Sequence, residues 1–209
     1  MPDIVLYEMK RTRSEKCRWA LREAGLPYRS EGNSPRAMGS EEVLKIHPLG
    51  KLPAALIDGK PLFESVAIVN AVADLVPEKD LIPKAGTWDR VLHDQWAFFT
   101  VTEVEAWAWS GFLNKSPMLQ AAEDRIPKAV EQSGKFFRKG AQVLEDRLGQ
   151  MSYLLGAGFG AIDIIASVAL VMGRKTGYLD NGFPNLNAYL DRLSEREFCP
   201  FKPVAAAAT

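Results

Sequence analysis

Residues 47–65, HPLGKLPAALIDGKPLFES, decide how the first part of the chain folds. The apolar run Ala54–Ile57 predicts a strand, and Asp58-Gly59 predicts a tight turn into a second short strand at Pro61–Phe63. His47-Pro48 ends a helix-like run before the hairpin, and Glu64-Ser65 begins another helix after it. The stretch therefore predicts a β-hairpin held between two helices.

Leu52-Pro53, just before the first hairpin strand, predicts a place where an extended ligand pairs with the main chain. A proline at the start of a strand has no N–H to donate, so the backbone of Leu52 is left available. We expect a cis Leu52-Pro53 peptide, which exposes this backbone. Glu64-Ser65 adds side-chain oxygens and unpaired N–H groups at a helix start, which suit the charged end of an amino acid.

The residues before this stretch complete a small mixed domain. Asp3–Glu8 is an apolar run that predicts a buried strand, and residues 15–24 have apolar positions at helical spacing. Leu26–Tyr28 predicts a second, weaker strand, and residues 40–47 predict a short helix. Together with the hairpin and a helix over residues 65–75, the order is βαβαββα. This order predicts an α/β domain of thioredoxin type.

The second half of the chain predicts an all-helical domain. We place the first domain at residues 1–77, a linker at 78–87 that contains Pro83 and Gly86, and the helical domain at 88–209. An almost wholly apolar helix from Ile162 onward is expected to lie at its centre. The other expected helices cover residues 88–112, 118–148 with Pro127 as a kink or break, and 184–196, and the tail after Pro203 is expected to be frayed.

Composition excludes several classes of function. The 209 residues carry 26 basic and 26 acidic side chains, so no overall field favours nucleic acid or an anionic membrane. The two cysteines, Cys17 and Cys199, and the two histidines lack the spacing of a metal site or of a disulfide scaffold. No signal segment or membrane span is expected, and we interpret the protein as soluble and cytoplasmic.

The arrangement resembles the cytosolic glutathione transferases. Gly50-Lys51-Leu52-Pro53 corresponds to the family's GK(L/V)P-type segment, and Glu64-Ser65 corresponds to the acid-serine pair that follows the hairpin. Gly160-Ala161-Ile162-Asp163 stands where the family has a Ser/Thr-x-x-Asp capping box at its buried helix. The resemblance implies a homodimer that uses glutathione as co-substrate, without a metal, for detoxification.

The resemblance also implies which residues bind glutathione. Leu52, next to Pro53, would pair with the cysteinyl part through its backbone, and Glu64 and Ser65 would bind the γ-glutamyl end. The glycyl carboxylate needs a cation. Three candidates are left open for it: Lys51, His47 and Arg13.

In this family the thiolate is stabilised by a residue at the start of the first helix. The matching segment is Arg11-Thr12-Arg13-Ser14, and we rank Thr12 first, Ser14 second and Arg11 third, since a hydroxyl can donate to sulfur. Five of the nine residues from Lys10 to Arg18 are basic and would favour an anion. Cys17 shares a helix face with apolar residues, which predicts a buried structural cysteine rather than a nucleophile.

The second substrate would lie against the first long helix of the helical domain. The aromatic load there suits a hydrophobic electrophile, with Trp96, Phe99 and Trp107 as candidate lining residues. The leading hypothesis is a glutathione transferase, with glutathione-dependent peroxide reduction or ether cleavage as related activities. The alternative is a non-catalytic binding or interaction protein of the same fold. A Ser-Ser-Cys run typical of the isomerase branch is absent from the sequence.

Overall fold

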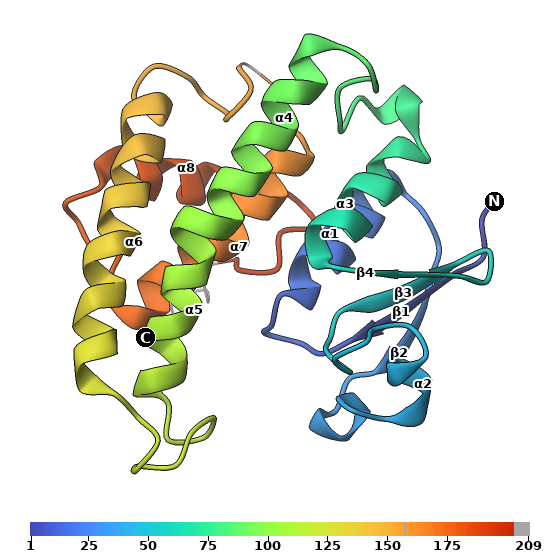
Figure 1. The fold of residues 1–209 in the computed structure, drawn as a ribbon. Helices are drawn as coiled ribbons and strands as arrows, with labels where there is room; N and C mark the ends of the chain where they lie inside the picture. The colour runs from blue at the N-terminus through green and yellow to red at the C-terminus, as the bar shows by residue number, and fades with distance from the viewer. Residues whose placement is uncertain (157, 203–209) are drawn as a thin grey trace, which may run out of the picture. The chain divides into compact units, whose positions relative to one another are not determined.

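The computed structural model describes residues 1–156 and 158–202, which form two compact units (Figure 1). The N-terminal unit comprises Met1–Lys84 together with Glu197–Lys202, and the helical unit comprises Ala85–Arg196. The return of Glu197–Lys202 to the N-terminal unit differs from the predicted division, which assigned these residues to the helical domain. The frayed tail expected after Pro203 lies outside the described residues.

A four-stranded sheet forms the centre of the N-terminal unit. Its strands are β1 (Ile4–Glu8), β2 (Arg29–Gly32), β3 (Ala54–Ile57) and β4 (Lys60–Phe63), in the order β2-β1-β3-β4. β1 runs parallel to β2, and the pairs β1–β3 and β3–β4 are antiparallel. This mixed sheet confirms the thioredoxin-like arrangement.

The second strand begins three residues later than predicted, at Arg29 instead of Leu26. Gly25 adopts a left-handed conformation with φ of 68°, and the Leu26 N–H donates to the Leu21 carbonyl at 3.0 Å. Leu26 therefore still belongs to the cap of the preceding helix, and Pro27 has no N–H for a ladder. The sheet starts after both.

Helices α1 (Ser14–Ala24) and α3 (Ser65–Asp74) pack against each other in the N-terminal unit, and α2 (Glu41–Leu44) is a single turn. Ser40 caps α2 by accepting from the Val43 N–H at 3.3 Å. Asp58 and Gly59 have φ of 49° and 73°, and this suits the tight turn predicted between β3 and β4.

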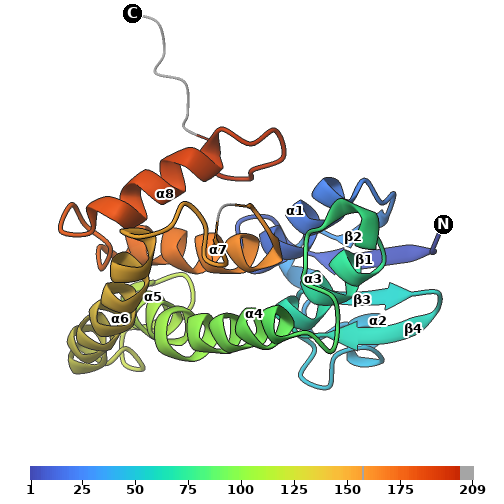
Figure 2. The same ribbon diagram turned by 90° about the horizontal axis from the view of Figure 1, so that it is seen from above.

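The helical unit contains α4 (Trp88–Phe99), a π-helical segment (Thr100–Glu105), α5 (Ala106–Lys115), α6 (Pro127–Leu148), α7 (Ala161–Thr176) and α8 (Pro184–Ser194). Figure 2 shows α7 between α8 on one side and α4 with α5 on the other. Eleven of its residues are buried, as its apolar sequence predicted. Pro127 starts α6, where a missing N–H costs nothing, instead of kinking a longer helix.

Asp163 closes the N-terminus of α7. Its Oδ2 accepts from the Gly160 N–H at 2.8 Å, while its Oδ1 accepts from the Leu154 N–H at 3.0 Å and the Tyr189 hydroxyl at 2.6 Å. Burial raises the pKa of Asp163 to about 6, although all three donors favour the carboxylate. Asp163 thus supplies its own half of the capping box, while Gly160 has no side chain to accept from the Asp163 N–H. Among the described helices, none is long and apolar enough to cross a membrane.

Candidate functional site

The register of the sheet brings three loop segments to one end of the N-terminal unit. Tyr7 on β1 pairs with Ala54 on β3, and Ala54 pairs with Phe63 on β4. The residues that follow Glu8, precede Ala54 and follow Phe63 therefore leave the sheet at the same end. These are the predicted catalytic loop, the Leu52-Pro53 turn and the start of α3.

The Leu52-Pro53 peptide is cis, as expected. Pro53 is buried and Leu52 is half-buried. No hydrogen bond joins the Leu52 main chain to another described residue, because the β1–β3 and β3–β4 ladders begin at Ala54. Its N–H and carbonyl are thus available to a ligand that lies in an extended conformation.

The N-terminus of α3 is also open. Glu64 is the cap residue, but its side chain makes no capping hydrogen bond, and the first main-chain bond runs from the Ile68 N–H to the Glu64 carbonyl at 3.0 Å. The first three N–H groups of the helix are left without an intrahelical acceptor. Such a terminus attracts a carboxylate through both hydrogen bonds and the helix dipole.

Glu64 and Ser65 differ in how they can meet a ligand. The Glu64 side chain is exposed, and its φ of 71° lies in a region that costs a non-glycine residue of the order of 1–3 kcal/mol. Ser65 is only 6% exposed, so it offers far less side-chain surface than its neighbour. Both predicted residues lie at the open helix end, with Glu64 the more accessible.

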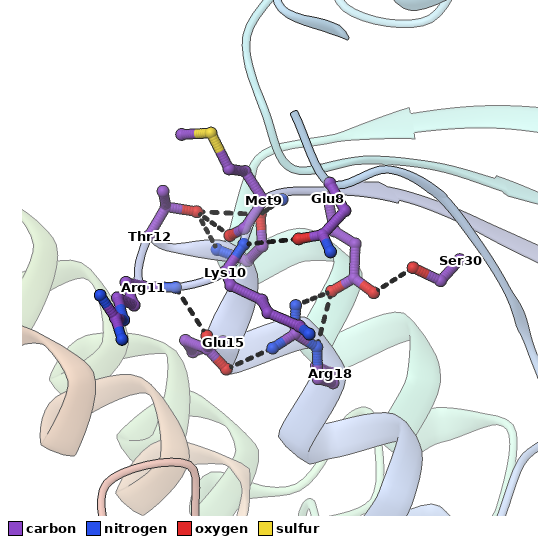
Figure 3. A network of polar contacts seen from close by, with 10 residues as sticks. Glu8, Met9, Lys10, Arg11, Thr12, Glu15, Arg18 and Ser30 are labelled. Atoms are coloured by element: carbon purple, nitrogen blue, oxygen red, sulfur yellow. Dashed lines mark hydrogen bonds and ion pairs between the residues drawn. The ribbon is translucent and has the colours of Figure 1, made fainter. Parts of the chain in front are cut away.

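The β1–α1 loop, residues Met9–Arg13, satisfies its own polar groups (Figure 3). The Thr12 hydroxyl donates to the Met9 carbonyl at 2.6 Å and lies 3.1 Å from Ser14 Oγ, while the Ser14 N–H donates to Thr12 Oγ1 at 3.2 Å. Ser14 Oγ accepts from the Met9 N–H at 3.1 Å. The loop is tied back onto the start of α1.

These contacts separate the three catalytic candidates. Ser14 is 0% exposed and its Oγ accepts from the Met9 N–H, so it offers no surface to a thiol in this structure. Thr12 is half-buried and its single hydroxyl proton points to Met9 in this structure. Arg11 is exposed, with φ of 63°, and its main-chain N–H donates to Glu15 Oε1 at 2.7 Å. Thr12 and Arg11 stay as predictions.

A buried ion-pair network lies under this loop, and sequence analysis missed it. Arg18 Nε donates to Glu8 Oε2 at 2.8 Å and its Nη1 donates to Glu15 Oε2 at 2.8 Å, while the Ser30 hydroxyl donates to Glu8 Oε1 at 2.6 Å (Figure 3). Burial lowers the pKa of Arg18, but the hydrogen bond that Arg18 donates to Glu8 and the charges of Glu15 and Glu8 outweigh burial and raise it. Glu8 ends an otherwise apolar strand, and a carboxylate at such a position indicates a buried charged partner.

The three candidates for the glycyl carboxylate also differ. Lys51 is exposed beside the cis proline, and Arg13 is half-buried. His47 is 5% exposed, its Nδ1 accepts from the Leu49 N–H at 3.1 Å, and its ring lies 5.0 Å from that of Phe63. His47 therefore stabilises a turn, and its role at the glycyl carboxylate stays a prediction less favoured than that of Lys51.

The aromatic candidates of the helical unit pack among its helices. The rings of Trp96 and Phe99 meet edge to face at 5.6 Å, and the Arg147 guanidinium lies 4.6 Å from the Trp96 ring. Trp107 stacks on Phe136 of α6 at 4.6 Å. These contacts assign Trp96 and Trp107 to packing against α6, so a single pocket lined by all three rings stays a prediction.

Both cysteines are free thiols that lie buried in the structure. Cys17 is fully buried, its Sγ lies 3.7 Å from the Ser65 carbonyl oxygen, and burial raises the pKa of its thiol. This confirms the expectation that Cys17 lies on the buried face of its helix, and a buried thiol with a raised pKa is a poor nucleophile. Cys199 is buried as well. Within residues 1–156 and 158–202, no group of three or more His, Cys, Asp or Glu side chains is placed to hold a metal ion.

The fold defines a class of protein: a thioredoxin-like domain with a cis-proline turn, followed by a helical unit. Residues 2–74 match the family described as the glutathione S-transferase N-terminal domain. Residues 2–74 therefore carry a glutathione S-transferase N-terminal domain.

Individual relatives are distant. A probable glutathione S-transferase of Oryza sativa subsp. japonica is 28% identical over 167 residues, which cover 75% of this chain and 74% of the relative. The elongation factor 1-gamma of Prunus avium is 31% identical over 132 residues, 63% of this chain, but these cover only 30% of that protein.

Solved structures agree over nearly the whole chain. The bacterial glutathione transferase BphK, in a ternary complex, has a TM-score of 0.83 at 26% identity and covers 93% of this chain and 95% of its own. A sphingomonad glutathione S-transferase complexed with glutathione has a TM-score of 0.80 at 23% identity, covering 93% of this chain and 94% of its own.

Proposed function

We propose that the protein binds glutathione and activates its thiol for attack on a hydrophobic electrophile. The unpaired main chain of Leu52 carries this proposal, because it lies at the same end of the sheet as the open N-terminus of α3. The cysteinyl part would pair with Leu52, and the γ-glutamyl carboxylate would accept from the N–H groups of α3. Glu64 would accept from the α-ammonium group, and Lys51 or Arg13 would meet the glycyl carboxylate.

The chemistry requires a thiolate, which must be stabilised by about 1.4 kcal/mol for each unit by which its pKa falls. Thr12 is the hydroxyl at the start of α1 that is not fully buried, and Arg11 adds an exposed cation beside it. To donate to sulfur, the Thr12 hydroxyl must turn away from the Met9 carbonyl, which it meets at 2.6 Å. Peroxide reduction or ether cleavage would begin from the same thiolate.

A second candidate is a non-catalytic glutathione-binding or interaction protein. Two observations favour it: the Thr12 proton is already engaged within the loop, and elongation factor 1-gamma is among the relatives. Such a protein would keep the Leu52 site and lack thiol activation. A homodimer and a cytoplasmic location belong to either proposal.

Two measurements separate these candidates. Retention of the full chain on immobilised glutathione tests the binding site, and absorbance of the bound thiolate against pH tests activation. We expect retention and a thiol pKa at least one unit below that of free glutathione, with the depression reduced in Thr12→Ala. Retention with an unshifted thiol pKa would support the binding protein, and absence of retention would refute glutathione binding and leave only an interaction role.

A further inference from the structure

A cavity of about 380 Å³ lies within the N-terminal unit, between α1 and the returning segment Phe198–Pro200. This volume falls in the range of small-molecule sites. The charged side chains that line it are mostly cationic: Lys10, Arg11, Arg18 and Arg22 against the single acid Glu15. We call this cavity the cationic pocket. Sequence analysis did not single it out.

The cationic pocket keeps an excess of positive charge after its internal ion pairs are counted. Glu15 accepts from both the Arg11 main chain and Arg18, and Arg18 also pairs with Glu8 outside the pocket. The four cations therefore face two carboxylates, which leaves an excess of two positive charges in a chain whose overall formal charge is zero. Within the described part of the chain, Lys10 and Arg11 form no ion pair through their side chains.

The cationic pocket is distinct from the open end of α3. Cys17 marks the face of α1 that meets α3, since its Sγ lies 3.7 Å from the Ser65 carbonyl. Glu15 and Arg22 lie about 140–160° around the helix from Cys17, given roughly 100° per residue. The pocket therefore opens on the opposite face of α1 from the Leu52 and Ser65 groups.

Polar groups make up most of its lining, and apolar side chains form a smaller part of it. Phe198 and Pro200 come from the returning segment, and Trp19 comes from α1. The segment is held in place by the Trp19 and Phe201 rings, which meet edge to face at 5.5 Å. A ligand that fits must therefore combine an anionic group with a compact apolar body.

We propose that the cationic pocket binds a small organic phosphate ester. Guanidinium groups match the oxygens of a phosphate in planar, paired hydrogen bonds, and Lys10 adds a point charge. The ester's apolar body would lie against Phe198 and Pro200. This site goes beyond the proposed glutathione chemistry, shares Arg11 with it, and does not require glutathione to be bound.

Calorimetric titration of the full chain with phenyl phosphate, at low ionic strength and without glutathione, tests the proposal. We expect one saturable site, competition by inorganic phosphate, and no binding of phenol. Lys10→Met and Arg22→Met keep the aliphatic stems and should each weaken phenyl phosphate binding by about tenfold. Lys45→Met removes an exposed lysine outside the pocket and should leave binding unchanged.

Three results would overturn the assignment. The first is the absence of saturable binding, and the second is equal weakening by Lys45→Met, which would show attraction to overall charge. The third is inorganic phosphate binding as tightly as phenyl phosphate, which would leave the apolar part of the lining without a role. Retention of the same samples on immobilised glutathione is a separate readout, so failure here leaves the proposed function untouched.

Discussion

The N-termini of α1 and α3 lie in the same unit and differ in how their polar groups are satisfied. At α3, Glu64 makes no capping bond and the first N–H groups await an acceptor. At α1, the Thr12 and Ser14 hydroxyls close the loop on itself, and Glu15 accepts from the Arg11 main chain. The N–H groups at the start of α3 can donate directly to a ligand's hydrogen-bond acceptor. At the start of α1, the Thr12 hydroxyl must first break its hydrogen bond to the Met9 carbonyl before it can donate to a thiolate.

The loop at the N-terminus of α1 is held by a network of ion pairs that is buried beneath it. Arg18 joins Glu8 to Glu15, and Glu15 in turn accepts from the Arg11 main chain. Ion pairs of this kind contribute little net stability relative to apolar residues, but removing one partner leaves an uncompensated charge. The network therefore fixes the position of the loop more than it stabilises the fold.

The largest effect is expected from Arg18→Met. It leaves the Glu8 carboxylate buried without its cation, and we expect a loss of about 3–5 kcal/mol in the free energy of unfolding, measured by urea denaturation. The double variant Glu8→Gln with Arg18→Met should recover part of this loss. Arg29→Met, which breaks the exposed Arg29–Glu31 pair, is the matched control and should change stability by less than about 1 kcal/mol. Equal losses in both single variants would contradict a special role for the network.

The next effect concerns the N-terminus of α7, where the Asp163 carboxylate accepts from three donors. In Asp163→Asn, an amide NH₂ group replaces one carboxylate oxygen, so at least one of the three donors to Asp163 loses its acceptor. A buried donor without an acceptor costs about 1–3 kcal/mol of unfolding free energy. Comparison of wild type and variant by urea denaturation measures this cost.

The pH dependence of that difference gives a second readout. The folded pKa of Asp163 is raised to about 6 from 3.8, so the folded state binds the proton more tightly than the unfolded state. The stabilisation from this proton is full below pH 3.8 and is lost as the pH rises through about 6. The stability difference between wild type and Asp163→Asn should therefore be larger at pH 4 than at pH 7. A difference that grows with pH would contradict the raised pKa.

The open end is tested by Glu64→Gly against Glu64→Ala. Glycine accepts φ of 71° without strain, so Glu64→Gly should raise the free energy of unfolding by about 1 kcal/mol. Both variants remove the carboxylate and should weaken glutathione binding by about tenfold, measured by calorimetry. The pair separates strain from ligand contact, because only the glycine variant gains stability. Unchanged affinity in both would remove Glu64 from the binding site.

The open end was predictable from sequence, and the closed one was not. Local signals specify the open end: a proline before a strand, a turn at Asp58-Gly59, and an acid-serine pair at a helix start. At the N-terminus of α1, the structure depends on which hydroxyl, Thr12 or Ser14, is buried. Hydrogen bonds with Met9 decide this, and no known sequence pattern predicts them. The partner of Glu8 is likewise ten residues away on another element.

The smallest effect on stability is expected at Thr12. Substitutions there test whether the N-terminus of α1 can open for a ligand as that of α3 does. Thr12→Val removes one hydroxyl bonded to the Met9 carbonyl and should cost about 1 kcal/mol of unfolding free energy, while Thr12→Ser should cost less. If the hydroxyl turns from Met9 to the thiolate when glutathione binds, the valine variant raises the pKa of the bound thiol by about one unit, and the serine variant keeps it low. Absorbance of the thiolate against pH distinguishes the two. Identical thiol pKa values in wild type, Thr12→Val and Thr12→Ser would mean that the closed end stays closed, and the protein would then bind glutathione without activating it through Thr12.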